Sequence, residues 1–169
     1  MSKTVDFKSL QKESWKTKIP RLEDKTFDCD IFVLDGAEIA SIRLTGNLVV
    51  GDHCTILHIV AGADVWVGYA THLGTVSCAN LFVNNGSYLH GDIHADGHVI
   101  IGNFVEGYYA CSIFAAGDIT IGDTSHLGIV SAIGNIIVGN DVIIYHINAF
   151  ACLMIGKNSD IGSLYIDSL

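Results

Sequence analysis

Short triplets of the form apolar-x-apolar recur along the chain at intervals of about 17 residues. Alternation with a period of two, rich in Val and Ile, is typical of a strand with one buried face. The pattern therefore predicts a series of short strands. Their apolar pairs are Ile31/Val33, Leu48/Val50, Val65/Val67, Leu81/Val83, Val99/Ile101, Ile119/Ile121, Ile136/Val138 and Leu153/Ile155.

A glycine follows six of these triplets, at Gly51, Gly68, Gly102, Gly122, Gly139 and Gly156. The gaps are 17, 34, 20, 17 and 17 residues, so one member of the series is missing at position 85, where the chain has Asn85. Asparagine is the residue that most readily replaces glycine in a left-handed backbone conformation. We therefore expect this slot to be a left-handed corner of the repeating unit.

A fixed repeat of this length is the signature of a solenoid, in which stacked units bury a continuous core. The chain divides into eight coils, seven of 17 residues and one of 20, with the extra three residues near positions 106–109. We predict an all-β fold, a single-stranded β-helix (β-solenoid) at residues 28–169 that is roughly 38 Å long. The coils are 28–44, 45–61, 62–78, 79–95, 96–115, 116–132, 133–149 and 150–166.

The first 27 residues differ from the rest and form a separate basic segment, with seven Lys and Arg against four acids. Phe7, Leu10 and Trp15 lie near helical spacing, and Pro20 would stop a helix. We predict a short amphipathic helix that caps the first coil. Its alternatives are a solvated tail and a helix on a membrane surface.

The C-terminal coil, residues 150–166, is followed by only three residues. An uncovered strand edge is a template for pairing with another chain. We therefore predict a homo-oligomer that self-associates at this edge, through Leu153, Ile155, Ile161, Tyr165 and Ile166.

The stretch at 86–102 and the G-D-I-x-I-G rhythm at 117–122 resemble the bactofilins, a family of polymer-forming cytoskeletal proteins. This resemblance covers roughly residues 40–166. It implies a right-handed, triangular β-helix and nucleotide-free filaments built by end-to-end stacking. It also implies a scaffold for client proteins in the bacterial cytoplasm, often at the membrane.

The alternative function is a hexapeptide-repeat acyltransferase with a left-handed β-helix, because segments such as Ile121-Gly122-x4-Leu127-Gly128 fit a six-residue rhythm. Three hexads would need 18 residues per coil, whereas this chain repeats every 17. An acyltransferase would also be stabilised by coenzyme A. A third interpretation is a domain that binds a partner on a flat apolar face.

Charge and hydropathy limit the partners and the cellular location that we expect for the protein. Residues 28–169 hold Arg43 and Lys157 against 14 acids, and this acidic body disfavours nucleic acid as a partner. The mean hydropathy is +0.43, yet no run of about 20 apolar residues could span a membrane. Five cysteines and no secretory signal predict a cytoplasmic protein, with the basic segment able to contact a membrane surface or client proteins.

We expect no catalytic, metal or cofactor site. His72 and His126 share a slot three coils apart, and His90, His94 and His98 occupy different slots, so we expect surface or stacked histidines. The cysteines lie at scattered slots and are expected to be small buried hydrophobes. Acids flank the corners, where Asp usually accepts backbone hydrogen bonds. They are Asp35, Asp52, Asp64, Asp92, Asp118, Asp123 and Asp141.

Overall fold

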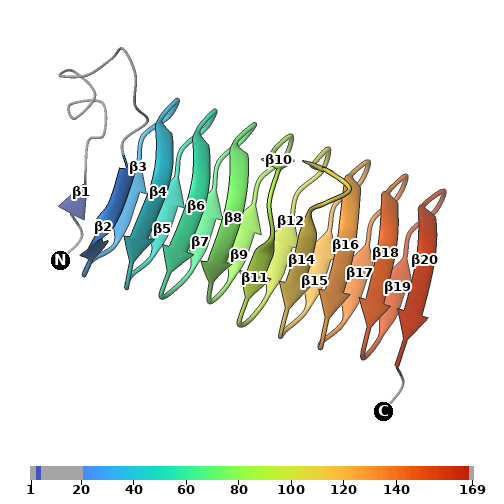
Figure 1. Cartoon of the computed structure of the whole chain (residues 1–169). Helices are drawn as coiled ribbons and strands as arrows, with labels where there is room; N and C mark the ends of the chain where they lie inside the picture. The colour runs from blue at the N-terminus through green and yellow to red at the C-terminus, as the bar shows by residue number, and fades with distance from the viewer. Residues whose placement is uncertain (1–2, 5–20, 168–169) are drawn as a thin grey trace.

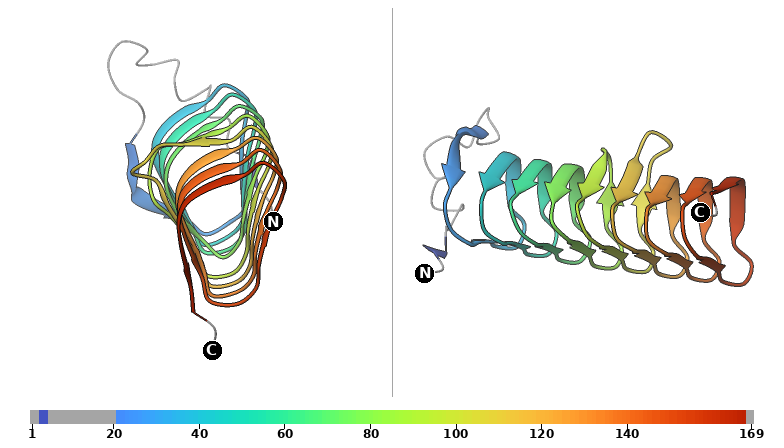
Figure 2. Two further views of the ribbon diagram at one scale, coloured as in Figure 1. Left: turned by 90° about the vertical axis from the view of Figure 1, so that its right-hand side faces the viewer. Right: turned by 90° about the horizontal axis from the view of Figure 1, so that it is seen from below.

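The computed structural model describes residues 3–4 and 21–167 of the chain, which wind into a β-solenoid of about eight turns (Figure 1). Every strand pairing in these residues is parallel, and none of them is helical. Seen along its axis, the rod is a stack of closed loops with its interior between two sheets (Figure 2). The predicted all-β solenoid of eight coils is confirmed.

Each coil contributes a short strand to one sheet and a longer segment to the other. The nine-stranded sheet consists of β1 (Lys3–Thr4), β3 (Ile31–Val33), β5 (Leu48–Val50), β7 (Val65–Val67), β9 (Leu81–Val83), β12 (Val99–Ile101), β15 (Ile119–Ile121), β17 (Ile136–Val138) and β19 (Leu153–Ile155). The eleven-stranded sheet consists of β2 (Arg21–Phe27), β4 (Glu38–Leu44), β6 (Thr55–Ala61), β8 (His72–Cys78), β10 (Tyr88–Leu89), β11 (Ile93–Ala95), β13 (Glu106–Gly107), β14 (Ser112–Ala115), β16 (His126–Ala132), β18 (Ile143–Ala149) and β20 (Asp160–Ile166).

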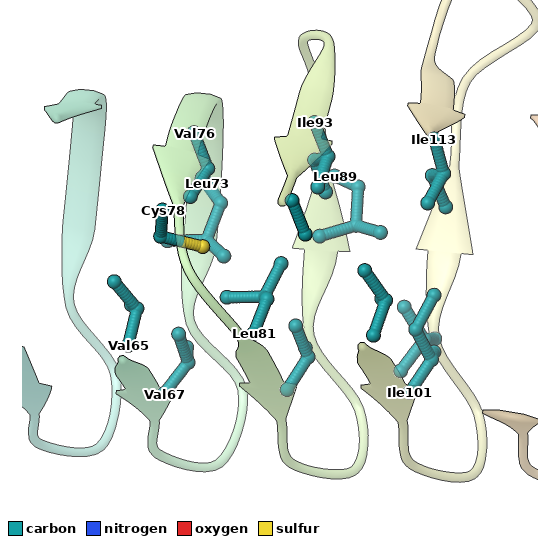
Figure 3. Packing of buried hydrophobic residues seen from close by; sticks show 14 of the residues in the cluster. Val65, Val67, Leu73, Val76, Cys78, Leu81, Leu89, Ile93, Ile101 and Ile113 are labelled. Carbon is teal, nitrogen blue, oxygen red and sulfur yellow. The ribbon is translucent and has the colours of Figure 1, made fainter. Parts of the chain in front are cut away.

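Buried side chains form columns along the rod because strands pair in register from coil to coil. The inward residue of one strand lies beside the inward residue of the next, as Val76, Ile93 and Ile113 do (Figure 3). Both members of each apolar-x-apolar pair point inward in the first seven coils. The core is therefore one continuous tube of Val, Ile and Leu, and this tube accounts for much of the high hydropathy.

The three-residue insertion predicted near 106–109 is confirmed. Glu106 pairs with His126, a separation of 20 residues, whereas Ser112 pairs with Ile129, a separation of 17. Residues 108–110 therefore have no counterpart in the following coil, and they lie between β13 and β14.

The prediction of a left-handed corner at the glycine slot is wrong. The positive φ angles lie two residues further along each coil, and none of the glycines that follow the triplets has one. Among the described residues, six of the eight with a left-handed backbone are not glycine, so the sequence gives little indication of where they lie. They are Gly36, His53, Ala70, Gly86, Phe104, Thr124, Asp141 and Asn158.

The glycine slot instead leaves room for a side chain from the preceding coil. Oδ1 of Asp35 accepts a hydrogen bond from the backbone N–H of Asp52 (2.9 Å), and a Cβ at Gly51 would overlap this oxygen. The expectation that corner acids act as backbone acceptors is confirmed here. In five further pairs, Oδ1 of the first residue accepts a hydrogen bond from the backbone N–H of the second. These pairs are Asp52–Tyr69, Asn85–Asn103, Asn103–Asp123, Asp123–Asn140 and Asn140–Lys157.

Asn84, rather than Asn85, occupies the glycine slot, because Val83 pairs with Val67. In the preceding coil the acceptor position holds Tyr69, where the neighbouring coils have Asp52 and Asn85. Oδ1 of Asn84 accepts the hydrogen bond from the N–H of Asn85 (2.8 Å). Asparagine thus replaces glycine because it supplies an acceptor within its own coil.

At the N-terminal end, β1 pairs with β3 and β2 pairs with β4. The ladder therefore begins before residue 28, where we placed the domain boundary. The predicted cap residues Phe7, Leu10 and Trp15 lie outside the described residues. Within the described part of the chain, no helix has the length and hydropathy needed to cross a membrane.

Candidate self-association edge

The last coil presents core side chains to solvent. Leu164 continues the column of Ile147, yet Leu164 is 47% exposed and Ile147 is fully buried. Leu153 and Ile161 are partly buried against the core, while Ile155 and Ile166 are exposed. Leu153, Ile155, Ile161, Leu164 and Ile166 form what we name the terminal apolar patch.

The structure changes the predicted set of edge residues by one member. Tyr165 pairs with Asn148 between two inward positions, so its side chain faces outward and not along the column. The rings of Tyr165 and Phe150 meet edge-on, with their centroids 6.4 Å apart. Leu164 was missed, although the 17-residue spacing from the inward Ile147 identifies it. Tyr165 thus lies beside the terminal apolar patch.

The backbone of the last coil is open as well. Among the described residues, β19 pairs with β17 and β20 pairs with β18, and neither has a partner on its other side. The backbone groups of β19 and β20 that point away from β17 and β18 are therefore unpaired, about every second residue of the two strands. Such an edge is a template for another strand.

The first and last coils differ in the burial of their inward side chains. The inward side chains of the first coil are buried, including Ile31, Ile39 and Ile42. Their counterparts in the last coil, Leu153, Ile161 and Leu164, are partly buried or exposed. Among the described residues, the core side chains of the last coil are thus more exposed than those of the first coil.

A second apolar surface runs along the side of the rod. The outward residue at the middle of each short strand is apolar in seven of eight coils, and two of these rings, Trp66 and Phe82, stack at 5.5 Å. The flat apolar face that the third interpretation requires is therefore present. The column consists of Phe32, Val49, Trp66, Phe82, Ile100, Thr120, Ile137 and Met154.

Two histidines that sequence reasoning did not group lie in contact. Nδ1 of His72 is 2.9 Å from Nε2 of His90, with parallel rings 5.2 Å apart, and Tyr88 stacks on His72 at 4.5 Å. His90 lies in the irregular link between β10 and β11, so the coil register did not reveal this pair. Burial and the neighbouring His72 lower the pKa of His90.

Other histidines join hydrogen bonds between coils. Nδ1 of His58 lies 2.6 Å from Oγ1 of Thr75, and Nδ1 of His98 accepts the N–H of Asp118 (3.0 Å). In the range 21–167, no three His, Cys, Asp or Glu side chains converge as a metal site requires.

The cysteines are all free thiols, and three of the five are buried. Burial raises the pKa of Cys78 and of Cys111 to about 12, so both thiols stay protonated and unreactive in neutral solution. Cys54 is buried too, while Cys152 is exposed and Cys29 is intermediate. The expectation of buried hydrophobic thiols therefore holds for three of them.

Comparison of the chain with protein-family models, with curated proteins and with solved structures gave no match.

Proposed function

We propose that this protein is a non-enzymatic, self-associating scaffold of the bactofilin type, with coils that wind in a right-handed sense. The observation that carries the proposal is the open last coil, where the terminal apolar patch adjoins the unpaired outer edges of β19 and β20. Contact with a second copy would bury the terminal apolar patch and would also pair the open strand edge.

The exposure of the last coil favours contact between two C-terminal coils. Such a contact is self-complementary and closes as a two-fold dimer, the commonest symmetry of soluble oligomers. The dimer is therefore the smallest assembly that the proposal requires.

A pair of adjacent substitutions tests the proposal. Leu164→Arg places a charge within the terminal apolar patch, and we expect it to weaken self-association at least about 100-fold, because a buried unpaired charge costs several kcal/mol. Tyr165→Arg adds the same charge one residue later on the outward side, and we expect a change of about threefold or less. Sedimentation velocity at several protein concentrations measures both.

Circular dichroism serves as the folding control for both variants, and the exposure of Leu164 predicts that they fold. Equal loss of association in the two variants would indicate a contact through the outer face. If neither variant changed the sedimentation profile, the C-terminal edge would not be the interface.

A further inference from the structure

The three-residue insertion builds a feature that the other coils lack. The loop between β13 and β14 stands out from the rod (Figure 2), and beside it lies a hollow of about 290 Å³. The hollow is lined by Glu106, Gly107, Tyr108, Tyr109, His126, Ile143 and Tyr145. We name it the tyrosine hollow.

The tyrosines of this hollow are not needed to close the coil. Tyr108 is 58% and Tyr109 is 71% exposed, so their rings add little to the buried core. The regular coils make the same corner without residues equivalent to 108–110. Exposed aromatic rings that gather at one place mark a binding surface more often than a packing requirement.

Glycines flank Tyr145 in both neighbouring coils of the sheet. Leu127 pairs with Ile144 and Ile129 with His146, so Gly128 lies beside Tyr145 in the preceding coil. The same register places Gly162 beside Tyr145 in the following coil. The Tyr145 ring therefore stands between two positions without side chains.

The aromatic rings form one wall of the hollow. The rings of Tyr109 and Tyr145 lie 4.0 Å apart, and Tyr108 stacks on His90 at 5.1 Å. A hydrogen bond with Tyr109 raises the pKa of Tyr145, so this phenol stays neutral in neutral solution. The hollow is thus lined by electron-rich aromatic rings.

The charged side chains around the tyrosine hollow indicate the charge of the ligand that it would bind. The carboxylate of Glu106 lines the hollow, and neither Lys nor Arg does. Arg43 and Lys157 are the only Lys or Arg residues after position 27. Aromatic faces with a carboxylate attract cations, whereas anions are repelled and nucleic-acid bases would need a basic groove.

We propose that the tyrosine hollow binds an organic cation of the quaternary or substituted ammonium class. Such a cation is weakly hydrated, so it can exchange water for ring faces and for the Ile143 side chain. A small metal cation would need oxygen ligands, and Glu106 is the only carboxylate in the lining. The site lies on the side of the rod and does not depend on the proposed self-association.

Isothermal titration calorimetry with choline and with 3,3-dimethyl-1-butanol, its neutral isostere, tests this proposal. We expect choline to bind at least about 10-fold more tightly, because cation–π contacts and Glu106 act only on the charged ligand. Tyr109→Ala and Glu106→Gln should each weaken choline binding about fivefold or more. Tyr69→Ala removes an exposed tyrosine from a different corner and should leave the affinity unchanged.

Equal affinity for the two ligands would overturn the proposal and indicate a merely apolar hollow. It would also be overturned if choline failed to bind at concentrations up to about 20 mM, or if Tyr69→Ala weakened binding as much as Tyr109→Ala. Circular dichroism of each variant separates loss of the site from loss of the fold.

Discussion

Replacing Ile101 by alanine is expected to lower the free energy of unfolding by about 2–5 kcal/mol, the range for large-to-small changes in a packed core. Ile101 is 1% exposed, and its side chain lies between those of Val83 and Ile121 in the neighbouring coils. The substitution leaves a cavity that these strands cannot close, because their backbones are fixed in the ladders on both sides. Urea denaturation followed by circular dichroism measures the change.

Ile100 provides a matched control, because it is the same residue type in the same strand on the opposite face. It is 44% exposed, so Ile100→Ala should cost about 1 kcal/mol or less. Equal effects of the two substitutions would contradict the assignment of inward and outward faces along the nine-stranded sheet.

Gly128→Ala is expected to destabilise the protein by about 3 kcal/mol through overpacking. Gly128 lies directly under the insertion, where an added Cβ would overlap the carbonyl oxygen of Cys111 and lie 2.8 Å from that of Tyr108. These atoms belong to the backbone and cannot rotate away, so the loop or the coil must shift. Thermal and urea denaturation both report the loss.

Gly107→Ala is the comparison in the preceding coil, at the start of the same loop. The nearest atom to an added Cβ there is Cδ2 of Leu127 at 3.2 Å, the end of a side chain that can adjust. We expect a change within about 1 kcal/mol. A large loss at Gly107 together with a small loss at Gly128 would show that the loop does not pack as described.

The hydrophobic pattern was sufficient to predict the coils, because each buried column needs an apolar residue at a fixed interval. It also located the insertion, because residues added to one coil shift every later triplet. These features depend on the period alone, so they could be predicted without coordinates.

The corners were harder to predict because their constraints lie between coils. Gly51 is required by the Asp35 side chain beneath it, and His53 carries the left-handed φ (56°) with no glycine to signal it. Asn84 satisfies the N–H of Asn85 where the preceding coil has Tyr69. Single-coil reasoning about glycine conformation could not reveal these relations.

The candidate sites were predictable only where they follow the 17-residue period. The position of the last coil follows from the coil count, and Leu164 follows from its spacing to Ile147. The contact of His72 with His90 depends on an irregular link that breaks the period. Likewise, the tyrosine hollow depends on a loop that the repeat does not describe.

The most direct test of self-association is the mass of the full chain in solution. Light scattering coupled to size-exclusion chromatography, over micromolar concentrations and several salt conditions, gives this mass. We predict a mass of at least twice the 18.1 kDa of one chain, with dissociation on dilution. A mass of 18.1 kDa at every concentration and salt condition would contradict self-association through the C-terminal coil.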